Sequence, residues 1–142
     1  MSDWYQKEQL HIAVENGDLE KVKLLVESGS DVNAFDEHLS FTPLHYAVQC
    51  ENVEIIKYLL SAGADVNAHE EDKIGETPLG EVAATCSYEI AEILVNAGAD
   101  PTIPGWMKIS ALDRAKDRKK EEGKRVYGLL LNVSKQYFHC RA

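Results

Sequence analysis

Apolar residues recur along this chain in short groups whose spacing is typical of amphipathic helices. Ile55, Ile56 and Leu59 share one face of a predicted helix, and polar residues lie on the opposite face. Asn52 precedes this helix and is a favoured N-cap residue, while Gly63 supplies the left-handed conformation that ends many helices. The pattern therefore predicts a helix with one buried face.

A second, shorter helix is predicted directly before the first. Thr42 can cap it, and Pro43 suits its first position because the missing N–H has no helical partner there. Leu44, Ala47 and Val48 then form its apolar face. One such helix pair cannot cover its own apolar surface, so neighbouring pairs are expected to stack side by side.

Both parts of this unit are repeated along the chain. The segment at residues 27–34 reads Glu-Ser-Gly-Ser-Asp-Val-Asn-Ala. It returns as Ser-Ala-Gly-Ala-Asp-Val-Asn-Ala at 61–68 and as Asn-Ala-Gly-Ala-Asp-Pro-Thr-Ile at 96–103. Thr-Pro-Leu-His at 42–45 returns as Thr-Pro-Leu-Gly at 77–80. Two linked motifs that recur with a shift of 34 or 35 residues indicate a repeat protein.

The Thr-Pro-Leu-His and Gly-Ala-Asp-Val-Asn-Ala elements resemble the ankyrin repeat, over roughly residues 8 to 131. This resemblance implies an all-α solenoid of helix-turn-helix units joined by β-hairpin-like fingers. The predicted boundaries within a single domain of residues 1–142 are 8–40, 41–75 and 76–108 for three repeats, and 109–138 for a degenerate C-terminal capping repeat.

The resemblance also implies a structural role for two histidines. His45 lies in the Thr-Pro-Leu-His motif, and His11 holds the same place in the first unit. In the family this histidine usually ties neighbouring repeats together through hydrogen bonds. Gly80 replaces it in the third unit, so the corresponding link to the fourth unit is expected to be missing.

Charge is distributed unevenly between the two parts of the chain. Residues 1–104 hold five basic and twenty acidic residues, a net charge of −15, whereas residues 105–142 hold ten basic and four acidic residues, a net charge of +6. A basic run at residues 118–120 is followed by Glu121 and Glu122, and the acidic repeats would repel phosphates. Nucleic-acid binding is therefore not predicted, and a basic protein partner is favoured.

Several other classes of protein receive no support from the sequence. No apolar run approaches the ~20 residues of a membrane span, and the first residues lack the pattern of a secretory signal. Cys50, Cys86 and Cys140 are odd in number and widely spaced, which favours reduced thiols in a cytoplasmic protein. No known cofactor, metal or catalytic motif is present. An enzyme with an unrecognised site at Cys86 or Cys140 is the competing hypothesis.

The resemblance implies that a partner protein binds the concave surface formed by the fingers and the first helix of each unit. Five large apolar residues in the fingers are expected to be exposed there, although Phe41 and Trp106 could instead pack finger against finger. These apolar candidates are Phe35, Leu39, Phe41, Trp106 and Met107. The polar candidates are Asp36, Glu37, His38, Gln49, His69, Glu70, Glu71, Asp72, Lys73 and Glu76.

The sequence thus predicts a non-catalytic protein–protein interaction module, monomeric when unbound, whose acidic face engages a partner with a basic surface. It predicts neither a cofactor nor a metal site. A chain of 142 residues that shows no second domain also motivates a narrower alternative. In that alternative the chain is a dedicated inhibitor or immunity protein that occludes a basic toxin or enzyme.

Overall fold

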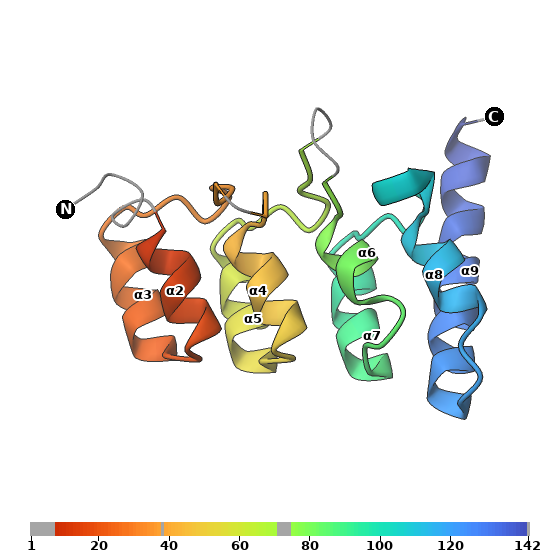
Figure 1. Cartoon of the computed structure of the whole chain (residues 1–142), viewed down its shortest axis with the longest axis horizontal. Coiled ribbons are helices and arrows are strands. Elements are labelled where there is room, and N and C mark those ends of the chain that lie inside the picture. The colour runs from red at the N-terminus through yellow and green to blue at the C-terminus, as the bar shows by residue number, and fades with distance from the viewer. Residues whose placement is uncertain (1–7, 38, 71–74, 142) are drawn as a thin grey trace.

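The computed structural model describes residues 8–37, 39–70 and 75–141, and its helices form pairs that stand side by side in a row (Figure 1). The helices are α2 (Gln9–Glu15), α3 (Leu19–Glu27), α4 (Pro43–Gln49), α5 (Val53–Ser61), α6 (Pro78–Val82), α7 (Tyr88–Asn96), the 3-10 turn η1 (Trp106–Lys108), α8 (Ala111–Lys116) and α9 (Glu121–Arg141). The predicted all-α repeat array is confirmed.

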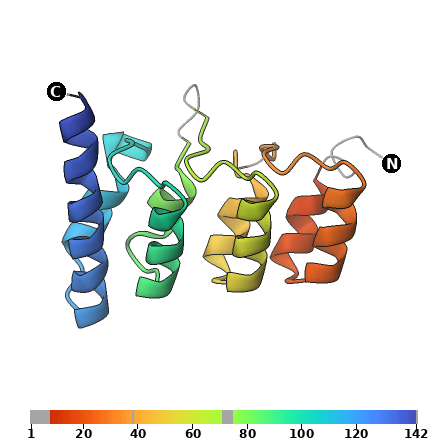
Figure 2. The same ribbon diagram turned by 180° about the vertical axis from the view of Figure 1, so that it is seen from behind.

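The first helices of the pairs, α2, α4, α6 and α8, form one layer, and α3, α5, α7 and α9 form the other (Figures 1 and 2). The fingers project together from one end of the stack, and the turns within each pair lie at the opposite end. No β-strand forms in the described parts of the fingers. Backbone hydrogen bonds close the first and third fingers instead, among them those from Asp36 N to Phe41 O at 2.8 Å and from Gly105 N to Ile109 O at 3.0 Å.

Local sequence signals set the ends of the second helices. The Asn52 side chain accepts a hydrogen bond from the N–H of Ile55 at 3.2 Å, which satisfies one of the free donors at the start of α5. Ser87 caps α7 in the same way through the N–H of Ile90. Gly63 follows α5 with a φ of 98°, a conformation that costs residues with a Cβ about 1 kcal/mol or more.

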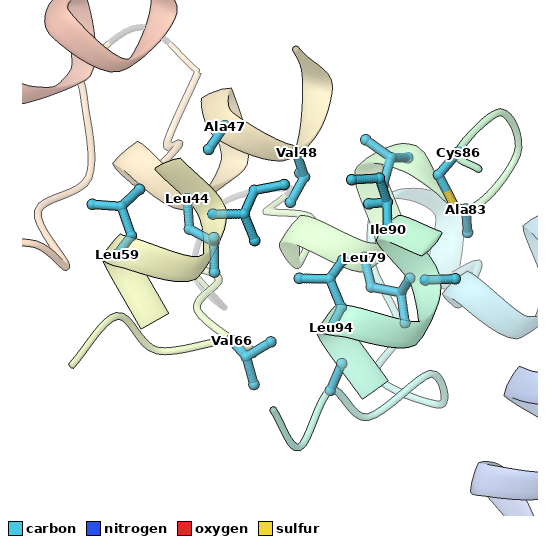
Figure 3. Close-up of a cluster of buried hydrophobic side chains, with 14 of the residues drawn as sticks. Leu44, Ala47, Val48, Leu59, Val66, Leu79, Ala83, Cys86, Ile90 and Leu94 are labelled. Carbon is cyan, nitrogen blue, oxygen red and sulfur yellow. The ribbon is translucent and has the colours of Figure 1, made fainter. Parts of the chain in front are cut away.

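The core lies between the two layers and between successive pairs. Figure 3 shows Leu44 and Leu59 of one pair and Leu79 and Leu94 of the next within one cluster of buried apolar side chains. All four side chains are almost fully buried, and each such burial contributes roughly 1.5–3 kcal/mol. Small residues such as Ala47 let the first helices approach closely. Stacking therefore stabilises units that would not be stable alone.

The third pair departs from this pattern at the turn between its helices. The equivalent turns of the first two pairs use Gly17 with a φ of 73° and Glu51 with a φ of 52°. In the third pair α6 ends early, at Val82, and Cys86 turns into the core, where it is 2% exposed.

Within the described residues, no helix has the length and apolar character that a membrane span requires.

Candidate functional site

An amide clamp at each of the first two repeat boundaries joins one unit to the next. The Asn67 side chain donates to Gly98 O at 3.1 Å and accepts from Asp100 N at 2.8 Å, so it spans the boundary between the second and third units. Asp65 orients it by accepting the Asn67 N–H at 2.9 Å. The same arrangement recurs one unit earlier around Asn33. These contacts fix the spacing of the fingers.

Asp36 organises the first finger from within. Its carboxylate accepts hydrogen bonds from the N–H groups of Leu39 at 2.9 Å and Phe41 at 3.1 Å. It also accepts a hydrogen bond from the hydroxyl of Tyr46 in α4. Burial alone would raise the pKa of Asp36, but these hydrogen bonds outweigh it and hold the pKa below its usual value. Asp36 is buried, so the expectation that it is an exposed acidic group was wrong.

Phe41 is also buried, contrary to the expectation that it is exposed. Its ring stacks on His45 with a centroid distance of 4.9 Å and meets Tyr46 edge-on at 5.6 Å. The alternative role in packing was therefore the better interpretation, although Phe41 packs on a first helix rather than on another finger. The buried ring covers His45, which joins the second unit to the third.

His45 forms the inter-repeat link that the family resemblance implies. The Thr42 N–H donates to Nδ1 at 2.9 Å, so the ring proton lies on Nε2, which donates to Glu76 O at 2.6 Å. Burial lowers the pKa of His45 from 6.5 to about 4, although the bond to Glu76 opposes this shift. His11 makes a similar link through Nε2, to Ala34 O at 2.7 Å. Both histidines are structural.

Glu76 replaces the histidine link at the boundary between the third and fourth units. Gly80 leaves space that the Glu76 side chain fills, because a Cβ on Gly80 would lie 2.7 Å from Glu76 Oε2. Glu76 Oε1 accepts the Trp106 N–H at 3.0 Å and pairs with Arg114 of α8 at 2.5 Å. The missing histidine is thus compensated by an ion pair, and the expectation that Glu76 is exposed was wrong.

The third finger ends in a tight turn that carries Trp106 and Met107. Met107 and Lys108 both have left-handed backbones, with φ of 58° and 61°, which is uncommon outside glycine. A hydrogen bond from Gly105 N to Ile109 O closes the turn, and a second one, from Trp106 N to the Glu76 carboxylate, ties it to the start of the third unit. Trp106 is 48% exposed and Met107 69% exposed, so this hydrogen-bonded turn holds two large apolar side chains in solvent.

The other predicted contact residues divide by exposure. Glu37, Leu39 and Gln49 are exposed, while Phe35, His69 and Glu70 are half-buried. His38, Glu71, Asp72 and Lys73 lie outside the residues that the structure describes. The structure therefore brings exposed candidates to three places, the first finger, the third finger and the layer of first helices.

Sequence reasoning missed Glu81 on that layer. Gln49 Nε2 donates to Glu81 Oε1 at 3.1 Å, which connects α4 with α6. Burial raises the pKa of Glu81, although the bond from Gln49 opposes this. Glu81 lies 35 residues after Tyr46, which is one repeat period, so the register of the first helices was the signal that could have found it.

The two described cysteines differ in burial. Cys86 is buried, and burial raises its pKa to about 11 even though Arg118 lies close and opposes the shift. Cys50 is exposed and lies 4.0 Å from Glu15 O. Among the residues that the structure describes, no three His, Cys, Asp or Glu side chains gather as a metal site requires.

Comparison with protein families agrees with this geometry. The family model for ankyrin repeats, in three copies, matches residues 7–104. No match is found among curated proteins. The helices α8 and α9 lie beyond the matched residues, and they close the stack by packing on α6 and α7. More than two thirds of the chain is covered by the match, and the chain belongs to the ankyrin-repeat family.

Proposed function

We propose that this chain binds a partner protein, without catalysing a reaction, through the face formed by its fingers and first helices. Ankyrin repeats are in general protein-interaction modules and are typically non-catalytic. The observation that carries the proposal is the exposed pair Trp106 and Met107 on a fixed turn. Large apolar side chains are typical of interface hot spots, and a turn whose backbone is already held by hydrogen bonds loses less conformational entropy when a partner binds.

The charge of the first three units supports a basic partner. Residues 1–104 carry a net charge of −15, and exposed Glu15 and Glu37 lie on the first helices and the first finger. Acidic groups of this kind accelerate the encounter with a basic surface and contribute less to the final affinity. Leu39, which is 57% exposed, adds a second apolar contact on the first finger.

Capture of partners from the native lysate tests the proposal. Three immobilised proteins are compared: the unaltered chain, W106A/M107A and L24A. Leu24 is a matched control because it is 66% exposed but lies on α3, in the layer of second helices (Figure 2). We expect the double variant to lose a partner that the chain and L24A both retain. Equal capture by all three proteins would contradict the proposal.

The partners recovered also test the narrower alternative. A single basic enzyme or toxin that loses activity at a one-to-one ratio would favour a dedicated inhibitor. Several unrelated proteins would favour a general adaptor. In both cases the association rate should fall as salt rises, because exposed charges are screened beyond a Debye length of about 8 Å at 0.15 M.

A further inference from the structure

A pocket of about 400 Å³ opens at the end of the stack opposite the fingers, between the third and fourth helix pairs. Ala84 and Thr85 line it from the turn after α6, and Arg118, Lys119 and Lys120 line it from the segment that joins α8 to α9. Its volume falls within the ~300–1,000 Å³ of small-molecule sites.

The early end of α6 contributes to this pocket. The equivalent helix of the second unit runs two residues further, to Gln49, which corresponds to Ala84. In the third unit the chain leaves the helix after Val82, and Cys86 then turns into the core. Because Ala84 and Thr85 are small residues, they leave the space beside Arg118 open.

Arg118 is held in place at the pocket. Its Nη1 donates to Cys86 O at 2.8 Å and to Ala83 O at 3.4 Å. Gly123 makes room for its side chain, because a Cβ there would lie 2.5 Å from Arg118 Cβ. A guanidinium carries its five N–H donors in one plane, and these two carbonyls hold that plane at the pocket, beside the Cys86 thiol. The side chain is thus pre-organised to bind an oxyanion.

The lining carries three positive charges and no carboxylate. Three nearby glutamates face other partners: Glu51 accepts the Ser87 N–H at 2.9 Å, Glu122 accepts the Tyr88 N–H at 3.3 Å, and Glu121 lies 3.6 Å from Lys124 Nζ. Asp117 precedes Arg118 and is exposed to solvent. The electrostatic balance inside the pocket therefore favours an anion, in a molecule whose other repeats are acidic.

We infer that this pocket binds a phosphate monoester, with Arg118 donating to its oxygens and Lys119 and Lys120 neutralising its charge. A phosphate group offers up to two negative charges and three strong acceptor oxygens, which suit three adjacent cations. The pocket is larger than a bare phosphate ion, so it also has room for the group that carries the ester. The site is independent of the fingers and of the function proposed for them.

Titration followed by amide NMR tests this site at constant ionic strength. The probes are inorganic phosphate, a phosphoserine peptide and the same peptide without phosphate. We expect saturable shifts at Ala84, Thr85, Lys119 and Lys120, with the phosphoserine peptide binding more tightly than inorganic phosphate. Saturable shifts with inorganic phosphate but not with the phosphoserine peptide would overturn the proposal that the ligand is a phosphate monoester. They would show a site for small anions instead. The absence of saturable shifts with both phosphate probes would overturn the site.

Two variants with the same change of charge make the test specific. K119Q/K120Q removes exposed lysines that line the pocket and should weaken binding by about tenfold or more. K57Q/K135Q removes two exposed lysines that do not line it and should leave the affinity within about twofold. Equal loss in the two variants would show diffuse attraction and overturn the proposal. Arg118 is not altered, because it also holds the turn after α6.

Discussion

Arg114 donates a hydrogen bond to Glu76 at 2.5 Å, and this ion pair joins the third helix pair to the fourth. The Glu76 side chain is only 10% exposed, so removing Arg114 would leave a carboxylate poorly solvated. We expect R114M to lower the free energy of unfolding by about 1–3 kcal/mol, and E76Q/R114M to restore part of the loss. Urea denaturation measures both changes.

An exposed ion pair provides the control for this prediction. Glu121 and Lys124 lie 3.6 Å apart in the first turn of α9, and both side chains are largely in solvent. K124M should leave the unfolding free energy unchanged within error, because exposed pairs contribute little. A loss of stability in K124M as large as that in R114M would show that any charge change weakens the cap.

Gly80 should behave differently from an ordinary helical glycine. Replacing glycine by alanine inside a helix normally stabilises it by about 1 kcal/mol. At position 80 the new Cβ would meet Glu76 Oε2 at 2.7 Å and Thr77 Oγ1 at 3.1 Å. Thr77 Oγ1 already accepts the Gly80 N–H, and the other oxygen of Glu76 is held by Trp106 N and Arg114. We expect G80A to lower stability by about 1 kcal/mol in the unaltered chain and to raise it in an E76A background.

Gly128 is the matched control because it lies within α9 and a Cβ there would meet no atom within 4 Å. G128A should therefore raise the unfolding free energy by about 0.5–1 kcal/mol in either background. Thermal or urea denaturation of G80A and G128A, each in the unaltered chain and in the E76A background, measures whether each substitution raises or lowers the unfolding free energy. If G80A also stabilised the unaltered chain, the proposed crowding by Glu76 would be wrong.

Sequence periodicity predicted the helices well because their ends depend on local contacts. Asn52 caps α5 through a residue three positions away, so the signal lies within one turn. The fingers were predicted less well. Asp36 is buried because Tyr46 of the following helix donates to it, and Glu76 is buried because its partner is 38 residues further along the chain. Such pairings have no local pattern, so loop residues that look exposed in sequence can be structural.

His45 makes stability depend on pH. Its pKa is about 4 in the folded chain and near 6.5 in the unfolded chain, so the unfolded chain binds the proton first as the pH falls. The stabilisation is therefore complete above pH ~6.5 and is lost between about 6.5 and 4, by an amount on the order of 3 kcal/mol. Urea denaturation between pH 4 and 8 measures the slope, and H45Q should remove this part of it. An identical slope in H45Q would contradict the assignment.

The amide clamp predicts a difference between two equivalent positions. Asn67 makes two hydrogen bonds across a repeat boundary, whereas Thr102, one period later, bonds to Asp100 of its own turn. We expect N67A to lower the unfolding free energy by about 1–2 kcal/mol and T102A to lower it by less. Hydrogen exchange should also become faster in the helices beyond this boundary, α6 to α9, and stay unchanged in α2 and α3 of the first unit. Equal losses in the two variants would argue against a clamp.

Met107 allows stability and binding to be separated. Its φ of 58° stores strain that glycine relieves, so M107G should raise the unfolding free energy by about 0.5–1 kcal/mol. The same substitution removes an apolar side chain that is 69% exposed, so capture of the proposed partner should fall. Lys108 is the control, because its φ of 61° is similar but its side chain is charged. K108G should gain the same stability and keep the partner. If M107G is more stable than the unaltered chain and captures the partner equally well, the Met107 side chain does not contact the partner. The strained backbone at this position would then not serve partner binding.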